Sequence, residues 1–72
     1  MEWATVKDVF EQKLWGNFDI DRIIIRVIET KRVIAANSEL MMIDNNKVVY
    51  MPTNSSAVIT LSSTEVEYLK ED

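Results

Sequence analysis

The chain has 72 residues, about half the length of an average domain, so we expect one domain spanning residues 1–72. Apolar residues make up 47% of it and charged residues 28%, with one glycine and one proline, which favours a folded soluble protein over a disordered one. Cysteine and histidine are both absent, which excludes disulfide staples and every catalytic design that uses a histidine base or a thiol nucleophile. The net charge of −4 disfavours binding to nucleic acid.

No apolar run approaches the ~20 residues that span a bilayer, and no secretory pattern follows Met1. We therefore expect a cytoplasmic protein without membrane contact. The charges are unevenly distributed: residues 1–21 and 52–72 are mainly acidic, whereas residues 22–51 carry five basic and three acidic side chains. Acidic ends around a basic middle could provide complementarity between subunits.

The first predicted element is a helix. Thr5 followed three residues later by Asp8 is a helix-start signal, and Gly16 supplies a stop. Apolar residues recur between them at helical spacing, at Val6, Val9, Phe10 and Leu14. We predict a helix over about Val6 to Trp15, with Trp15 pointing away from the apolar face, where another part of the chain or another subunit must cover it.

The stretch from Ile20 to Asn37 fits two structures. As a helix it places most of its isoleucines and valines in one broad sector. As strands it places Ile23, Ile25 and Val27 on one face and Arg22 and Arg26 on the other, with a turn at residues 29–32. That turn contains no Gly, Asn or Asp, which is unusual for a hairpin.

The downstream pattern favours strands. Leu40 to Ile43 and Lys47 to Met51 flank an Asp-Asn-Asn turn, which predicts a hairpin, and residues 57–61 alternate as a further strand. Turn signals therefore recur every eight or nine residues, as in an antiparallel meander. Ser62 followed by Glu65 is a second helix-start signal and predicts a helix over Thr64 to Lys70, with an edge strand as the alternative.

These elements predict an α+β protein: an N-terminal helix, five short antiparallel strands forming a curved sheet or small barrel, and a short C-terminal helix. The alternative is two helices packed on a three-stranded antiparallel meander. Several strands are apolar on both faces, whereas a half-solvated antiparallel sheet should have one polar face. Because one short helix cannot cover all of the second face, we expect a homo-oligomer.

Acidic residues are the only candidates for catalysis or metal binding. Asp19 and Asp21 lack the further acids and the glycine of a calcium loop, so capping and turn roles are expected for them. Residues 61–68 resemble a short segment of retrotransposon-type ribonuclease H domains, in which a glutamate at the start of a helix binds metal, and the resemblance implies that role for Glu65. This family also carries aspartates on other strands, and the segment before Glu65 has none in suitable surroundings. We expect no metal, no cofactor and no small-molecule ligand.

These features predict a small non-enzymatic protein-interaction or regulatory module, of the kind common among accessory proteins of bacteria and phages, which binds itself and another protein. The alternative is an acidic inhibitor that mimics nucleic acid on its target, and a carboxylate-dependent metal hydrolase using Glu65 with Asp19 or Asp21 comes third. The residues expected at the interface are apolar anchors and charged strand positions: Trp15, Arg22, Ile24, Arg26, Ile28, Met41, Glu65 and Glu67.

Overall fold

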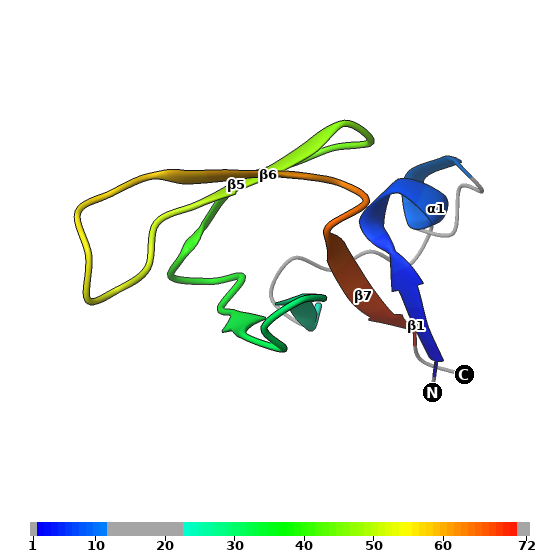
Figure 1. Cartoon of the computed structure of the whole chain (residues 1–72), viewed down its shortest axis with the longest axis horizontal. Coiled ribbons are helices and arrows are strands. Elements are labelled where there is room, and N and C mark those ends of the chain that lie inside the picture. The colour runs from blue at the N-terminus through cyan, green and yellow to red at the C-terminus, as the bar shows by residue number, and fades with distance from the viewer. Residues whose placement is uncertain (1, 12–22, 71–72) are drawn as a thin grey trace.

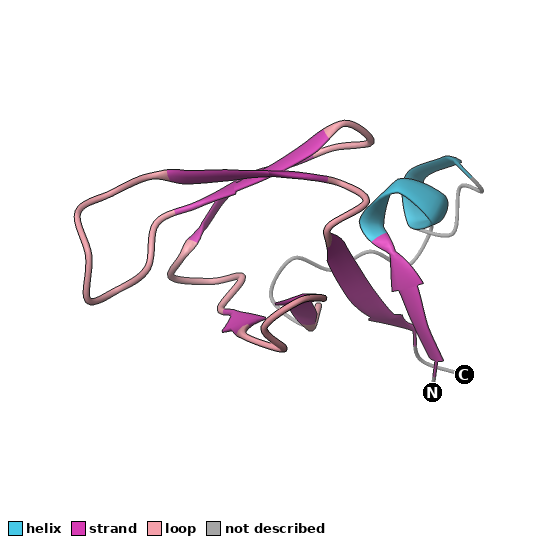
Figure 2. Cartoon of the chain, in the orientation of Figure 1, coloured by secondary structure: helices cyan, strands magenta, loops and turns pink. Residues whose placement is uncertain are grey.

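The computed structural model describes residues 2–11 and 23–70, and within them the chain forms two antiparallel sheets that do not close into a barrel (Figure 1, Figure 2). The elements are β1 (Glu2–Thr5), α1 (Val6–Glu11), β2 (Ile25–Val27), β3 (Val33–Ile34), β4 (Leu40–Ile43), β5 (Lys47–Tyr50), β6 (Ile59–Ser62) and β7 (Val66–Lys70). The larger sheet has the strand order β1-β7-β2-β3, and the smaller has the order β4-β5-β6.

The predicted architecture is therefore wrong in its main features. Neither a barrel nor a single curved sheet is present, and the alternative with two helices is wrong as well, because α1 is the only helix among the described residues. A strand precedes this helix. Thr5 does mark its start, since the hydroxyl of Thr5 accepts a hydrogen bond from the amide of Asp8 at 3.1 Å. The predicted extension beyond Glu11 to Trp15 lies outside the described residues.

The predicted C-terminal helix is instead a strand. β7 pairs with β1 on one side and with β2 on the other, so residues 66–70 form a central strand of the larger sheet. The helix-start signal folds as a turn: the Glu65 carboxylate accepts a hydrogen bond from the Ser62 amide at 3.0 Å, and the Glu65 amide donates to the Ser62 carbonyl at 2.9 Å. The same local hydrogen bonds can begin a helix or close a turn. Here they close a turn, because residues 66–70 pair with strands on both sides.

The middle segment is extended, as the strand interpretation predicts, with β2 and β3 joined by a tight turn. Lys31 supplies the left-handed conformation that glycine or asparagine usually provides, at φ 61°. This conformation costs about 1 kcal/mol for a residue with a Cβ. The turn is closed by backbone hydrogen bonds of 2.8 Å from the Lys31 amide to the Val27 carbonyl and from the Val27 amide to the Arg32 carbonyl.

The hairpin of β4 and β5 is confirmed. Its turn is held by Asp44, whose Oδ1 accepts hydrogen bonds from the amides of Asn46 and Lys47, both at 2.8 Å. The register of the two strands shifts between Leu40 and Met42, so that β4 has a bulge. The bulge breaks the alternation of side chains, and both Met41 and Met42 are exposed instead of one of them facing the core.

The core lies between the two sheets and α1. Its buried members come from α1, from both sheets and from the position two residues before β2: Val6, Ile23, Ile25, Val27, Ile34, Val48, Tyr50 and Val66. β1 and β7 lie side by side, so the two ends of the described chain meet at one side of the molecule, while the loop between β5 and β6 projects at the other (Figure 1). Within residues 2–11 and 23–70, no helix is long and apolar enough to cross a membrane.

Candidate interaction surfaces

The outer face of the smaller sheet carries an apolar cluster next to the polar side chains of Thr60 and Ser62. In β5, Val48 and Tyr50 face the core, so that Val49 points outward and the following Met51 is 41% exposed. On β4, Met41 and Met42 are 60% and 47% exposed, and Val58, next to β6, is 54% exposed. We call this surface the methionine face and define it by Met41, Met42, Val49, Met51 and Val58. Methionine side chains are flexible and polarisable, which suits a surface that adapts to a partner.

The methionine face carries almost no charge. The three strands beneath it contain one charged residue, Lys47, at the start of β5. An antiparallel sheet exposed to water on one side normally alternates apolar and polar residues, so a charge-poor outer face is a candidate for burial against another molecule.

A charged cluster occupies the outer face of the larger sheet. Arg26 on β2 lies directly opposite Glu67 on β7, and the two side chains form an ion pair. The Arg26 guanidinium also stacks on the ring of Trp3 from β1, with its carbon 3.7 Å from the ring centroid, and Lys31 lies 3.8 Å from the Glu67 carboxylate. Two of the charged residues that the sequence suggests for contact between subunits, Arg26 and Glu67, are therefore already paired within one chain.

Glu39 is a buried carboxylate, 6% exposed, that joins three segments. Its Oε1 accepts a hydrogen bond from the amide of Ala35 at 2.9 Å, and its Oε2 accepts one from the amide of Thr53 at 2.9 Å. The Arg32 guanidinium lies 3.3 Å from Oε2. The two backbone hydrogen bonds, together with the charge of Arg32, lower the pKa of Glu39 below its ordinary value of 4.5.

Acid should destabilise the fold through Glu39. A carboxyl whose pKa is lowered on folding adds stability at neutral pH, and this contribution is lost as the pH falls from about 4.5 through the folded-state pKa. Hydrogen bonds from the amides of Lys47 and Asn46 lower the pKa of Asp44 as well. The contribution of Asp44 to stability is therefore also lost in acid. We expect Glu39→Gln to lower the melting temperature at pH 7 by several degrees and to make its further fall in acid shallower.

Melting curves by circular dichroism between pH 7 and about pH 2.5 measure both effects. Glu29→Gln is the matched control, because Glu29 is exposed and makes no hydrogen bond or ion pair in the described part of the chain. If the melting temperature of Glu39→Gln falls with pH as steeply as that of the unmodified protein, the proposed role of this carboxylate is contradicted.

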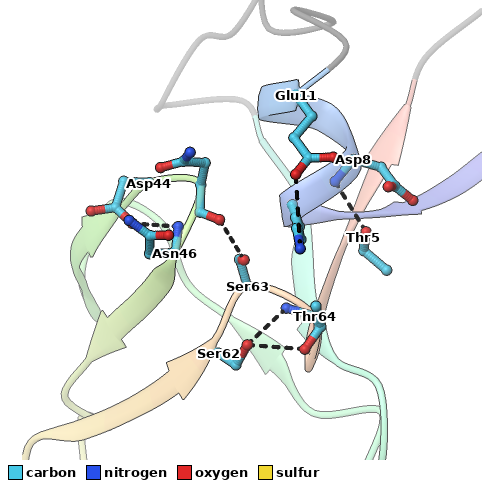
Figure 3. A network of polar contacts seen from close by, with 10 residues as sticks. Thr5, Asp8, Glu11, Asp44, Asn46, Ser62, Ser63 and Thr64 are labelled. Carbon is cyan, nitrogen blue, oxygen red and sulfur yellow. Dashed lines mark hydrogen bonds and ion pairs between the residues drawn. The ribbon is translucent and has the colours of Figure 1, made fainter.

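The turn between β6 and β7 is tied to the β4–β5 hairpin. Ser63 is buried, and its hydroxyl donates a 2.7 Å hydrogen bond to the carbonyl of Asn45 in the hairpin turn (Figure 3). The amide of Ser63 donates to the carbonyl of Asn46 at 3.0 Å, and the Ser62 hydroxyl contacts that of Thr64 at 2.9 Å. These bonds hold the crossing from the smaller sheet to the larger one.

A cavity of about 270 Å³ opens beside this crossing. Its walls come from the end of β2 and the turn after it, from the end of β6, and from the β6–β7 turn: Val27, Ile28, Glu29, Leu61, Thr64 and Glu65. Three of these side chains are aliphatic, two are carboxylates and none is basic. A cavity of this size accommodates one side chain of a partner rather than a cofactor.

The residues expected at an interface are spread over several surfaces. Met41 belongs to the methionine face, Ile24 is 43% exposed beside the Arg26–Glu67 pair, and Ile28 and Glu65 line the cavity. Trp15 and Arg22 lie outside the described residues. Val58 and Trp3 were not among the expected residues. The alternation of Val58 with Ile59 in the sequence could have identified Val58 as outward-facing. No such signal exists for Trp3, because the helix-start signal that follows it hides the strand on which it lies.

The described residues contain no group of three acidic side chains that could hold a metal ion. Glu65, which the resemblance to ribonuclease H places at the start of a helix, precedes a strand, so that part of the resemblance is wrong. No known family model, curated protein or solved structure matches this chain.

Proposed function

We propose that this protein is a non-enzymatic protein-interaction module that works as a homo-oligomer and binds another protein. The methionine face carries the proposal, because it is an apolar surface of five side chains on an antiparallel sheet whose other face already forms the core. Leaving such a surface in water forfeits about 25 cal/mol for each Å² of apolar area that a contact would bury. We assign the methionine face to contact between copies.

The charge of the chain supports a second copy as the occupant of this face. Two copies with a net charge of −4 each repel one another where their carboxylates approach within the Debye length, which is about 8 Å at physiological salt. The methionine face avoids this repulsion, since Lys47 is the only charged residue on the strands beneath it. A two-fold contact there buries apolar side chains without bringing carboxylates together, because the three strands contain none.

Val58→Glu should separate the copies. Burying an unpaired carboxylate in an apolar contact costs about 3 kcal/mol or more, which corresponds to a dissociation constant at least about 100-fold weaker. Light scattering coupled to size exclusion at 100 μM should therefore give a dimer or larger species for the unmodified protein and a monomer for Val58→Glu.

Val33→Glu is the matched control. Val33 is 56% exposed and Val58 is 54% exposed, but Val33 lies on β3 in the other sheet, so the same change there should leave the oligomer intact. A monomeric unmodified protein at 100 μM, or an equal effect of the two variants, would contradict the proposal.

The acidic-inhibitor alternative has one observation in its favour. β1 and β7 are neighbours, which brings residues 2–5 of the acidic N-terminal segment beside residues 67–70 of the acidic C-terminal segment. Glu67 is offset there by Arg26 and Lys31, and Glu11 by Lys7 at 3.8 Å, which reduces the negative field of this region. Partner binding that weakens steeply with salt would favour the inhibitor, and binding insensitive to salt would favour apolar contact.

A further inference from the structure

We propose that the free edge of β6 and the cavity at its end bind an extended segment of a partner protein that carries a lysine or arginine. This inference rests on the proposed binding of another protein, and it names the site and the chemistry of the partner. It combines two independent features of the described residues: an edge strand that can accept another strand, and an acidic side-chain cavity next to it.

The register of the smaller sheet shows where β6 is free to pair. Bonded and non-bonded residue pairs alternate in an antiparallel ladder. The Ser63 amide donates to the Asn46 carbonyl, so these two residues form a hydrogen-bonded pair. Counting along the ladder from this pair, every second pair of β5 and β6 is bonded, and the pair of Val49 with Thr60 is a non-bonded one. The N–H and C=O groups of Thr60 therefore point away from β5 toward the free edge.

β6 is the edge strand with the fewest obstacles to pairing. β4 is bulged, β3 has two residues, and β1 begins with a charged residue and runs directly into α1. β6 is regular and has no charge, no proline and no bulge. Bulges, charges and short length are the features that normally protect an edge from strand addition, so an added strand fits β6 best among the described strands.

Glu65 marks the end of the pairing edge. The N–H of Ser62 is bonded to the Glu65 carboxylate, and the C=O of Ser62 to the Glu65 amide, so neither is available to an added strand. An added strand pairs at Thr60 and has its next residue opposite Leu61. Because residues opposite each other in a sheet point to the same face, that side chain points inward like Leu61, which lines the cavity.

The cavity selects a basic side chain. Its aliphatic wall of Val27, Ile28 and Leu61 suits the methylene stem of lysine or arginine, and the carboxylates of Glu29 and Glu65 complement the charged end. Glu29 makes no hydrogen bond or ion pair within residues 2–11 and 23–70, so its charge is unmatched there. A second copy of β6 has no basic residue to offer, which favours a different partner protein.

The probe is the blocked pentapeptide Thr-Val-Lys-Val-Thr, titrated into ¹⁵N-labelled protein and followed by amide chemical shifts and hydrogen exchange. We expect shifts at Thr60, Leu61 and Glu65 and slower exchange of the Thr60 amide, because that amide gains a partner. The same peptide with glutamate in place of lysine should bind at least about tenfold more weakly. Shifts confined to other residues, or equal binding of the two peptides, would overturn the proposal.

Two sets of variants separate the edge from the cavity. Thr60→Pro removes the outward N–H and should abolish binding, whereas Thr60→Val keeps it and should bind normally. Glu65→Gln combined with Glu29→Gln keeps the acceptor for the Ser62 amide but should erase the preference for lysine over glutamate, which tests the cavity even if Thr60→Pro does not fold. Full binding by Thr60→Pro, or an unchanged preference in the double variant, contradicts the inference. The oligomer experiment with Val58→Glu is read out separately, so failure there does not decide this site.

Discussion

Ile25→Ala should remove a large share of the protein's free energy of unfolding, while Ile24→Ala should leave it nearly unchanged. The two residues are adjacent and identical, but Ile25 is 0% exposed in the core and Ile24 is 43% exposed on the outer face. Truncating a buried isoleucine costs about 2–5 kcal/mol, because apolar contact is lost and a cavity remains. A chain of this length has a free energy of unfolding of about 4–10 kcal/mol. The Ile25 change therefore removes a large share of the total.

Urea unfolding followed by circular dichroism measures this difference. Both variants and the unmodified protein should be compared at one protein concentration, because self-association adds to apparent stability. The Ile24→Ala midpoint should fall by an amount corresponding to about 1 kcal/mol or less. Equal losses for the two variants would mean that the strand faces are assigned incorrectly.

Leu61→Pro should strongly destabilise the protein, whereas Thr60→Pro should be tolerated. Hydrogen-bonded and non-bonded pairs alternate along β5 and β6, and Thr60 is in a non-bonded pair. Leu61, opposite Val48, is therefore in a hydrogen-bonded pair, and the Leu61 amide donates to β5. Proline at that position removes the donor and sets its ring against β5, at a cost of about 3 kcal/mol or more. At Thr60 the missing amide faces solvent, and the main cost is the restriction of φ.

Far-UV circular dichroism and the melting temperature test this pair of variants. A Thr60→Pro protein that is less stable than the Leu61→Pro protein would reverse the assigned orientation of β6. The result also decides whether Thr60→Pro is a clean reagent for testing strand addition at this edge.

Much of the smaller sheet was predictable because its signals are local. The Asp44 turn, the alternation of Val48 and Tyr50 with their neighbours, and the apolar second face all follow from residues close in sequence. The exposure of both Met41 and Met42 was not predictable, because a bulge is set by how two strands pair. The sequence therefore predicts an apolar second face on this sheet, but only some of the residues that are exposed on it.

Local signals misled at both ends of the chain. Ser62 and Glu65 make the bonds of a helix start, yet residues 66–70 pair with β1 and β2, whose sequences lie far away along the chain. Trp3 likewise belongs to a strand only because β7 is beside it. Lys31 adopts a left-handed turn that its own sequence does not favour, since the pairing of β2 with β3 requires it.

The sequence by itself determined the chemistry that is excluded, the extended character of the middle segment, the Asp44 hairpin and the presence of strands with two apolar faces. These properties follow from residue types and from spacing within about ten residues. The tertiary structure decided the division into two sheets, the central place of β7, the pairing of Arg26 with Glu67 and the joining of Glu39 to Ala35 and Thr53. Each of these depends on contacts between distant segments, which form only when the apolar faces of both sheets are buried against each other.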